Sequence, residues 1–221
     1  MEPEPVPHTA TVSKRKRQPR WKRRKEARPG EIVAAALELF GERGFEATKL
    51  ADVARRAGVT KGTLYLYFDS KEALFKAVVR ETIVPVIVQG EALARSHTGS
   101  ARELLEQLVR EYWRLVGETA AAGIPKLMMA EAATFPELTR FYYDEVVTRG
   151  HRLMAGVIER GIKNGEFRPV NVKLAAKLAM SPLMHATVVR RAFASVMPEG
   201  FNVQEYLDAH IDLYLHGIAN H

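Results

Sequence analysis

The sequence contains no cysteine among its 221 residues. This excludes disulfide bonds, thiolate catalysis and cysteine-ligated zinc, and it is typical of a cytoplasmic protein. Uninterrupted apolar runs are short, and none reaches the roughly 18 to 20 residues that a membrane-spanning helix needs. The N-terminus is rich in proline and then basic, with no apolar stretch behind it, so we expect no secretory signal. We therefore predict a cytoplasmic protein with no membrane partner.

The motifs of common enzymes and metal centres are also missing. No serine, histidine and aspartate in catalytic order, no phosphate-binding glycine loop and no paired buried carboxylates stand out. His151 and His185 have neither HxxxH spacing nor neighbouring carboxylates in a ligand pattern. We expect no enzyme, no bound metal and no cofactor; a pocket that turned over its ligand would revive the enzyme class.

Positive charge is concentrated near the start of the chain. Residues 14–28, KRKRQPRWKRRKEAR, contain ten Lys or Arg and one Glu, whereas the remainder has 23 basic and 25 acidic residues. A run of like charge cannot bury itself, so we predict a disordered basic arm over residues 1–27. Such an arm would neutralise the phosphates of nucleic acid. The alternative is a solvated tail that only aids solubility.

The body of the chain is predicted to be all-α. About nine segments repeat apolar residues at intervals of three and four, and no convincing strand is present. Pro29 suits a first helical turn, and Thr48 and Thr60 suit the N-caps of a second and a third helix. Gly58 suits the left-handed turn between those two, and the spacing of Asp69 and Glu72 predicts a capping box for a fourth. Three helices joined in this way are the layout of a helix-turn-helix DNA-binding domain, which we place at residues 28–80.

The stretch TKGTLYLYF, residues 60–68, has an unusually narrow apolar stripe. At about 100° per residue, Leu64 and Phe68 point together at the core, while Gly62 and Thr63 point outward. A helix that enters the major groove of DNA needs small or hydroxylated residues near its N-terminus, so that its backbone can approach the base edges. The pattern favours a recognition helix.

Residues 45–78, FEATKLADVARRAGVTKGTLYLYFDSKEALFKAV, resemble the DNA-binding segment of the TetR family of bacterial transcriptional regulators. The resemblance covers about a quarter of the chain. It implies contacts to the DNA backbone from Thr48, Tyr67 and Lys71. It implies contacts to bases from Lys49, Thr60, Lys61, Gly62, Thr63 and Tyr65. Leu66 departs from the aromatic or polar residue of many relatives, and we leave it out of the predicted contacts.

Each of these residues also has an ordinary structural interpretation. The threonines are common helix caps, the tyrosines could be half-buried rings, and Lys71 could be solvated. One docking pose would explain all of them together, whereas the ordinary interpretations must hold separately.

Residues 81–221 are expected to form an effector-binding and dimerisation domain, as the resemblance implies. Leu174, Leu178, Leu183 and Val189 give the helices near the C-terminus broad apolar faces that one small domain would struggle to cover. Two such helices from each of two chains make a four-helix bundle, so we predict a homodimer through the last two long helices. A dimer at nanomolar concentration would place two recognition helices on a near-palindromic operator.

The effector is predicted to be a small molecule of unknown identity. Flexible thioethers and rings line adaptable apolar cavities, although for any one of them plain core packing is the commoner role. The candidates are Met128, Met129, Phe135, Tyr142, Met154 and Met184. The stretch LMMAEAATFPELTRFYYDEV also looks like the ligand-sensing half of multidrug-efflux repressors in the same family.

The resemblance implies a repressor that its effector releases from DNA, although some members of the family activate. Effector binding would favour a second state in which the fourth helix moves as a lever and misaligns the recognition helices. The alternative is an effector-independent DNA-binding protein of the same fold, acting in chromosome organisation or cell division. It would bind many scattered sites that no small molecule vacates.

Overall fold

A computed structural model describes residues 20–193, 195–196 and 202–220, and the fold over these residues is all-α. The α-helices are α1 (Arg20–Arg43), α2 (Leu50–Arg56), α3 (Lys61–Tyr65), α4 (Lys71–Thr82), α5 (Val84–Ser96), α6 (Ala101–Tyr112), α7 (Gly123–Glu131), α8 (Pro136–Tyr142), α9 (Thr148–Lys163), α10 (Val172–Ala192) and α11 (Val203–Ile218). Two π-helical turns, Trp113–Gly117 and Tyr143–Val147, continue α6 and join α8 to α9, and a 3₁₀ turn spans Ala120–Ala122. In the described part, one isolated bridge between Phe167 and Ala219 is the only β-type pairing.

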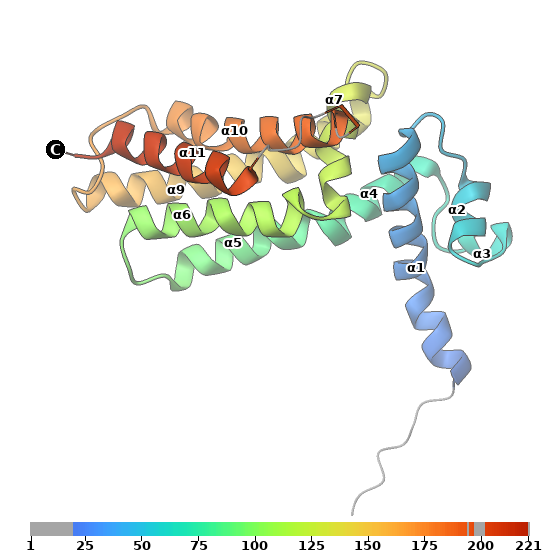
Figure 1. Cartoon of the computed structure of the whole chain (residues 1–221). Coiled ribbons are helices and arrows are strands. Elements are labelled where there is room, and N and C mark those ends of the chain that lie inside the picture. Colours follow the sequence, from blue (N-terminus) through green and yellow to red (C-terminus); the bar gives the residue numbers. More distant parts are fainter. Residues whose placement is uncertain (1–19, 194, 197–201, 221) are drawn as a thin grey trace, which may run out of the picture.

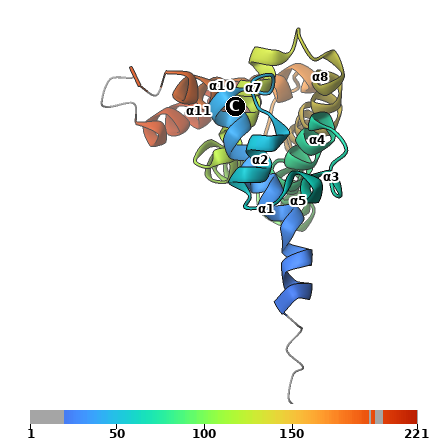
Figure 2. The ribbon, with the colours of Figure 1, turned by 90° about the vertical axis from the view of Figure 1, so that its right-hand side faces the viewer.

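The helices form two lobes (Figure 1). Helices α1 to α3 form a small lobe, which we call the reader, and α5, α6, α9, α10 and α11 form an elongated bundle. Helix α4 leads from the reader into the bundle, and the first turns of α1 project away from the body of the molecule (Figures 1 and 2). None of the described helices combines the length and apolar character needed to cross a membrane.

Two hydrophobic cores hold these lobes. The first contains the buried apolar residues of α1 to α4 and continues into α7 and α8 through Ile124, Leu127 and Leu138. The second lies between α6, α9, α10 and α11. Because α7 and α8 share the first core, they are anchored to the reader although they follow it by some 60 residues in the chain.

The expected starts of α1, α2 and α4 are wrong. Helix α1 begins at Arg20, so Pro29 lies inside a helix and the expected arm overlaps α1, while residues 1–19 lie outside the described residues. The segment before Pro29 is rich in Arg, Lys, Glu and Ala, strong helix formers that favour a helix start before the proline. Ser70, rather than Asp69, caps α4 by accepting a hydrogen bond from the Ala73 amide at 3.0 Å. Lys49, rather than Thr48, is the N-cap of α2.

Helix α5 was not expected from the sequence. Pro85 occupies its first turn, where the missing amide hydrogen costs nothing. The expected boundaries at residues 27–28 and 80–81 fall inside α1 and α4. Helices α1 and α4 therefore each cross an expected domain boundary.

Candidate DNA-reading surface and internal cavity

Helix α3 is short and is held by a cap and two anchors. As expected, Thr60 is its N-cap, and the Thr60 hydroxyl accepts a hydrogen bond from the Thr63 amide at 3.1 Å. Gly58 has a φ of 65°, the left-handed conformation expected for the turn before α3. Leu64 and Phe68 are buried in the first core. These contacts fix which side of α3 faces solvent.

The outer side of α3 carries most of the residues predicted to read bases. Lys61, Gly62 and Tyr65 are exposed, Thr63 is half-buried, and Lys49 is exposed at the start of α2. The Lys61 ammonium lies 5.7 Å from the centroid of the Tyr65 ring. A Cβ atom added at Gly62 would have Thr60 Oγ1, at 3.9 Å, as its nearest neighbour. Packing within the protein therefore does not require glycine at this position.

Thr48 has a structural role. Its side chain is 1% exposed, and its hydroxyl donates to the carbonyl oxygens of Gly44 at 2.7 Å and Leu39 at 3.2 Å. Both carbonyls belong to the end of α1 and the turn that follows it. The hydroxyl is therefore occupied inside the protein, contrary to the expectation that this side chain faces the DNA backbone.

Lys71 joins the reader's first turn to the start of α4. Its ammonium donates to the carbonyl oxygens of Phe45 at 2.8 Å and Glu46 at 2.9 Å, and it lies 4.5 Å from the centroid of the Phe45 ring. Two of its three hydrogens are used in this way. One hydrogen and the full positive charge remain for an anion at the N-terminus of α4. Tyr67 is half-buried and packs against the same core.

The turn at Phe45 and Glu46 is also contacted by the end of α7 and the start of α8. The Glu131 carboxylate, at the end of α7, accepts hydrogen bonds from the Phe45 amide at 3.2 Å and the Glu46 amide at 3.5 Å. Phe135, the N-cap of α8, packs edge-on against Phe45 with ring centroids 4.8 Å apart. We call these contacts of Glu131 and Phe135 with the turn the reader clamp.

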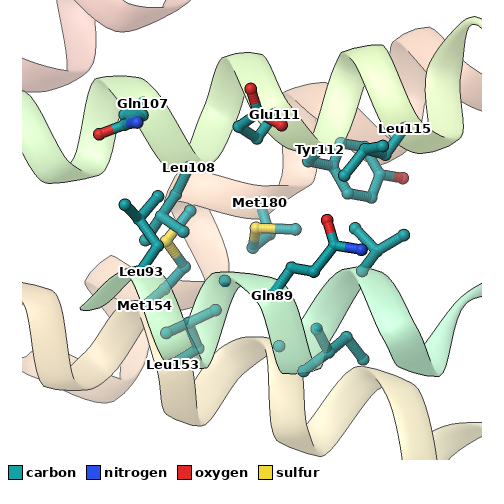
Figure 3. Close-up of a pocket in the computed structure, with 14 residues that line it drawn as sticks. Gln89, Leu93, Gln107, Leu108, Glu111, Tyr112, Leu115, Leu153, Met154 and Met180 are labelled. Carbon is teal, nitrogen blue, oxygen red and sulfur yellow. The ribbon is translucent and has the colours of Figure 1, made fainter. Parts of the chain in front are cut away.

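A cavity lies between α5, α6, α9 and α10 (Figure 3). It has two parts that share lining residues: one of about 270 Å³, which we call the outer part, and one of about 80 Å³ beside α7 and α8, which we call the inner part. Leu108, Leu115, Leu153, Met154 and Met180 line the outer part among others. The inner part is lined by side chains that include Val116, Pro125, Tyr142, His151 and Met184. The walls are mostly apolar, which is typical of a small-molecule site.

Polar groups are few in this cavity. Gln89 on α5 and Gln107 and Glu111 on α6 lie in the outer part (Figure 3). Arg114 donates to the Glu111 carboxylate from Nη2 at 2.7 Å. Burial lowers the pKa of His151, and the charge of Lys177 acts in the same direction, so this imidazole is neutral at pH 7. Burial also raises the pKa of the Tyr142 hydroxyl well above its usual value.

Three of the six predicted effector-site residues line the cavity, and three do not. Tyr142 and Met184 line the inner part and Met154 the outer part. Met128 is buried in the core shared with the reader, and Phe135 belongs to the reader clamp, so neither lines this cavity. Met129 does not line this cavity either, and its side chain is 66% exposed.

Several lining residues were missed by sequence reasoning. Gln89 and its neighbours lie on α5, which was not assigned as a helix. Met180 could have been predicted from the sequence, because it lies one helical turn before Met184 on the same face of α10. The described residues contain no cluster of three or more His, Asp or Glu able to hold a metal ion.

A strip of exposed apolar side chains runs along the outer faces of α10 and α11. Leu178 on α10 is 63% exposed and Leu213 on α11 is 74% exposed, and both line a shallow groove with Pro182, Tyr206 and Tyr214. Leu174, one turn before Leu178, is also exposed. Leu183 was expected on this face but is fully buried inside the bundle, and Val189 is half-buried. The exposed face is therefore narrower than the sequence suggested.

Two models of known protein families match this chain, one near its N-terminus and one over its C-terminal half. Residues 32–78 match the family described as bacterial regulatory proteins, tetR family. Residues 95–198 match the tetracyclin repressor-like C-terminal domain. The HTH-type transcriptional repressor KstR2 of Rhodococcus jostii (strain RHA1) is 33% identical over 153 residues, which are 68% of this chain and 74% of that protein.

This chain belongs to the TetR family. It is accordingly a DNA-binding transcriptional regulator with an N-terminal helix-turn-helix and is not an enzyme. The fatty acid metabolism regulator protein of Bacillus subtilis (strain 168) is another TetR-type relative in sequence, 26% identical over 157 residues, 70% of this chain and 79% of that protein.

Solved structures show the same TetR fold. The transcriptional regulator FadR from Bacillus subtilis in complex with stearoyl-CoA has a TM-score of 0.74 at 21% identity, covering 86% of this chain and 98% of that one. The ketosteroid transcriptional regulator KstR2 of Mycobacterium tuberculosis has a TM-score of 0.66 at 24% identity, covering 88% and 96%.

Proposed function

We propose that this TetR-family regulator is a dimeric repressor that binds a near-palindromic operator and leaves it when a small apolar molecule enters the cavity. The observation that carries the proposal is the combination, in one chain, of an exposed recognition helix and a largely apolar cavity. Both relatives that are named as repressor or as metabolic regulator support this class of function.

The proposed DNA surface is the outer side of α3 with its flanks. Lys61, Gly62, Thr63 and Tyr65, with Lys49 and Thr60 beside them, would approach the base edges in the major groove. Tyr67 and the remaining hydrogen of Lys71 would contact the DNA backbone, because anions are favoured at the N-terminus of α4. The Thr48 side chain is not part of the proposed DNA surface, because its buried hydroxyl donates to carbonyl oxygens within the protein.

Lys61→Ala is expected to change which operator is preferred. A lysine that donates to a guanine contributes about 1 to 3 kcal/mol of discrimination against the wrong base, so its loss should flatten the preference at one position of each half-site. The measurement is binding to a panel of operators with single substitutions. Equal weakening on every operator in the panel would contradict a base-reading role for Lys61.

The dimer is proposed to form through the exposed faces of α10 and α11. Leu174, Leu178 and Leu213 would leave water when the same faces of two chains meet in a four-helix bundle. Two-fold symmetry would then set two α3 helices about 34 to 36 Å apart, the spacing of consecutive major grooves on one side of DNA.

An acyl chain is a good candidate for the kind of molecule that fills the cavity. The apolar walls suit a hydrocarbon, and flexible Met154, Met180 and Met184 can adapt to its shape. The stearoyl-CoA held by the FadR of Bacillus subtilis supports this choice. The test of the proposed function is operator binding by fluorescence anisotropy with and without acyl compounds. Persistent binding in the presence of every small molecule tried would favour the effector-independent alternative.

Release would be transmitted through α7 and α8 as well as α4. Pro125 on α7 and Tyr142 on α8 line the inner cavity, whereas Glu131 and Phe135, at the opposite ends of these helices, form the reader clamp. A ligand that moves either helix would therefore displace the turn at Phe45 that precedes α2 and α3. The DNA-binding state and the effector-bound state would then differ in where the reader lies. A ligand that binds one of them better shifts the population toward it.

Glu131→Ala is expected to weaken the link between cavity and reader. Without the carboxylate, the Phe45 and Glu46 amides lose their bond to α7, so the shift of operator affinity caused by a saturating effector should shrink by roughly tenfold. Operator affinity without effector should change much less. The measurement is the ratio of operator Kd values with and without effector.

Glu137→Ala is the matched control, because Glu137 is an exposed glutamate on α8 outside the reader clamp. An effector response of normal size in the Glu131→Ala protein would show that the reader clamp does not carry the coupling.

A further inference from the structure

We infer that the cavity takes an acyl group whose carbonyl is neutral, as in an ester, thioester or amide, and discriminates against the free carboxylic acid, with Glu111 as the residue that sets this preference. The inference rests on the proposed function and specifies the ligand class of the same cavity. The inference is about the carbonyl end of the ligand, whereas the apolar walls would contact its hydrocarbon chain.

The charges of the lining residues point to a neutral ligand head. Among the described residues that line the two parts of the cavity there is no Lys and no Arg. His151, which could supply a positive charge, has its pKa lowered by burial and by the charge of Lys177. A ligand carboxylate beside these residues would find no cationic partner among the lining side chains. The neutral carbonyl of an ester or thioester needs no such partner.

The single acidic side chain in the lining strengthens the discrimination. Glu111 is held in place by Arg114, whose Nη2 and Nε lie 2.7 and 3.2 Å from Glu111 Oε2. Arg114 is largely exposed and does not line the cavity, whereas Glu111 does. A ligand carboxylate beside Glu111 would therefore lie closer to the Glu111 carboxylate than to the Arg114 guanidinium. Like charges at short range repel.

The side-chain amides of Gln89 and Gln107 can donate hydrogen bonds to a neutral ligand carbonyl. Gln89 on α5 and Gln107 on α6 line the same part of the cavity from facing helices, and Figure 3 shows Gln107 and Glu111 along α6 above Gln89. Both glutamines have solvent-exposed side chains, and neither has a hydrogen-bond partner within the described protein. Each amide can donate to a carbonyl oxygen. This places the ligand carbonyl near the solvent-facing side, so that a carrier group such as coenzyme A would extend into water.

The test compares dodecanoic acid, methyl dodecanoate and dodecanoyl-coenzyme A by direct calorimetric titration of the full chain near pH 7.5. We expect the ester and the thioester to bind at least about tenfold more tightly than the acid, a difference of about 1.4 kcal/mol. Tight binding of the thioester alone would identify a contribution from the coenzyme A group, whereas equal binding of both neutral forms would assign recognition to the carbonyl. An acid that binds as tightly as the ester would overturn the inference.

Glu111→Gln should raise the affinity for dodecanoic acid by about threefold to tenfold and leave the ester unchanged. Glu106→Gln is a closely matched control, because Glu106 lies on the same helix, pairs with Arg110 as Glu111 pairs with Arg114, and is equally exposed, but does not line the cavity. Identical gains in both variants would overturn the role of Glu111.

If none of the three compounds binds, the acyl class is wrong. Release from the operator by another small apolar molecule would still support the proposed function in that case. The two proposals therefore fail separately.

Discussion

Gly62→Leu is expected to abolish specific operator binding while the protein remains folded. The nearest atom to an added Cβ is 3.9 Å away, so the side chain would extend into solvent from the outer side of α3. On DNA the same side chain would occupy the space between the helix backbone and the base edges. We expect the operator Kd to rise at least about 100-fold, equivalent to about 2.7 kcal/mol. Anisotropy with labelled operator measures the loss.

The stability of this variant distinguishes a blocked surface from a damaged fold. Replacing glycine within a helix removes a propensity penalty of about 0.5 to 1 kcal/mol, so the unfolding temperature should stay unchanged or rise slightly. Gly156→Leu is the matched control, because Gly156 is also an exposed helical glycine with nothing near an added Cβ, and it lies on α9. Operator binding retained by Gly62→Leu, at wild-type strength, would remove α3 from the DNA interface.

The double change Leu178→Asp and Leu213→Asp is expected to convert the proposed dimer into monomers and to weaken operator binding by at least about 100-fold. Both leucines are mostly exposed in one chain, so the aspartates should be tolerated in the monomer. In a four-helix interface they would bring like charges together in an apolar layer. One recognition helix reads too few bases to hold a site alone. Sedimentation and anisotropy on the same samples measure both effects.

Val88→Asp is the control for this second prediction, because Val88 is an exposed apolar residue on α5, away from the α10 and α11 face. A double variant that sediments as the wild-type dimer would show that the two chains associate through another surface.

Local signals in the sequence predicted the recognition helix well. The cap at Thr60, the left-handed Gly58 and the inward Leu64 and Phe68 all depend on residues within a few positions of one another. Such contacts are set by helix geometry, which has a fixed period. The family assignment follows from the same segment.

Contacts between distant segments could not be predicted in this way. Phe135 packs against Phe45, 90 residues earlier in the chain. For Met128 and Met129, composition could not distinguish the core beside the reader from the solvent-facing surface. The cavity depends on how four helices come together, and only its Met and Tyr content was visible beforehand. Missing α5 removed one of its walls.

The most direct test of the central claim is selection of binding sites from a pool of random DNA duplexes by the full-length protein. The account predicts enrichment of a near-palindromic site whose half-sites lie one helical turn apart, about 34 to 36 Å, and no enrichment by the Gly62→Leu protein. Enrichment of an asymmetric or unspaced sequence, or of the same site by Gly62→Leu, would contradict a symmetric dimer that reads DNA with α3.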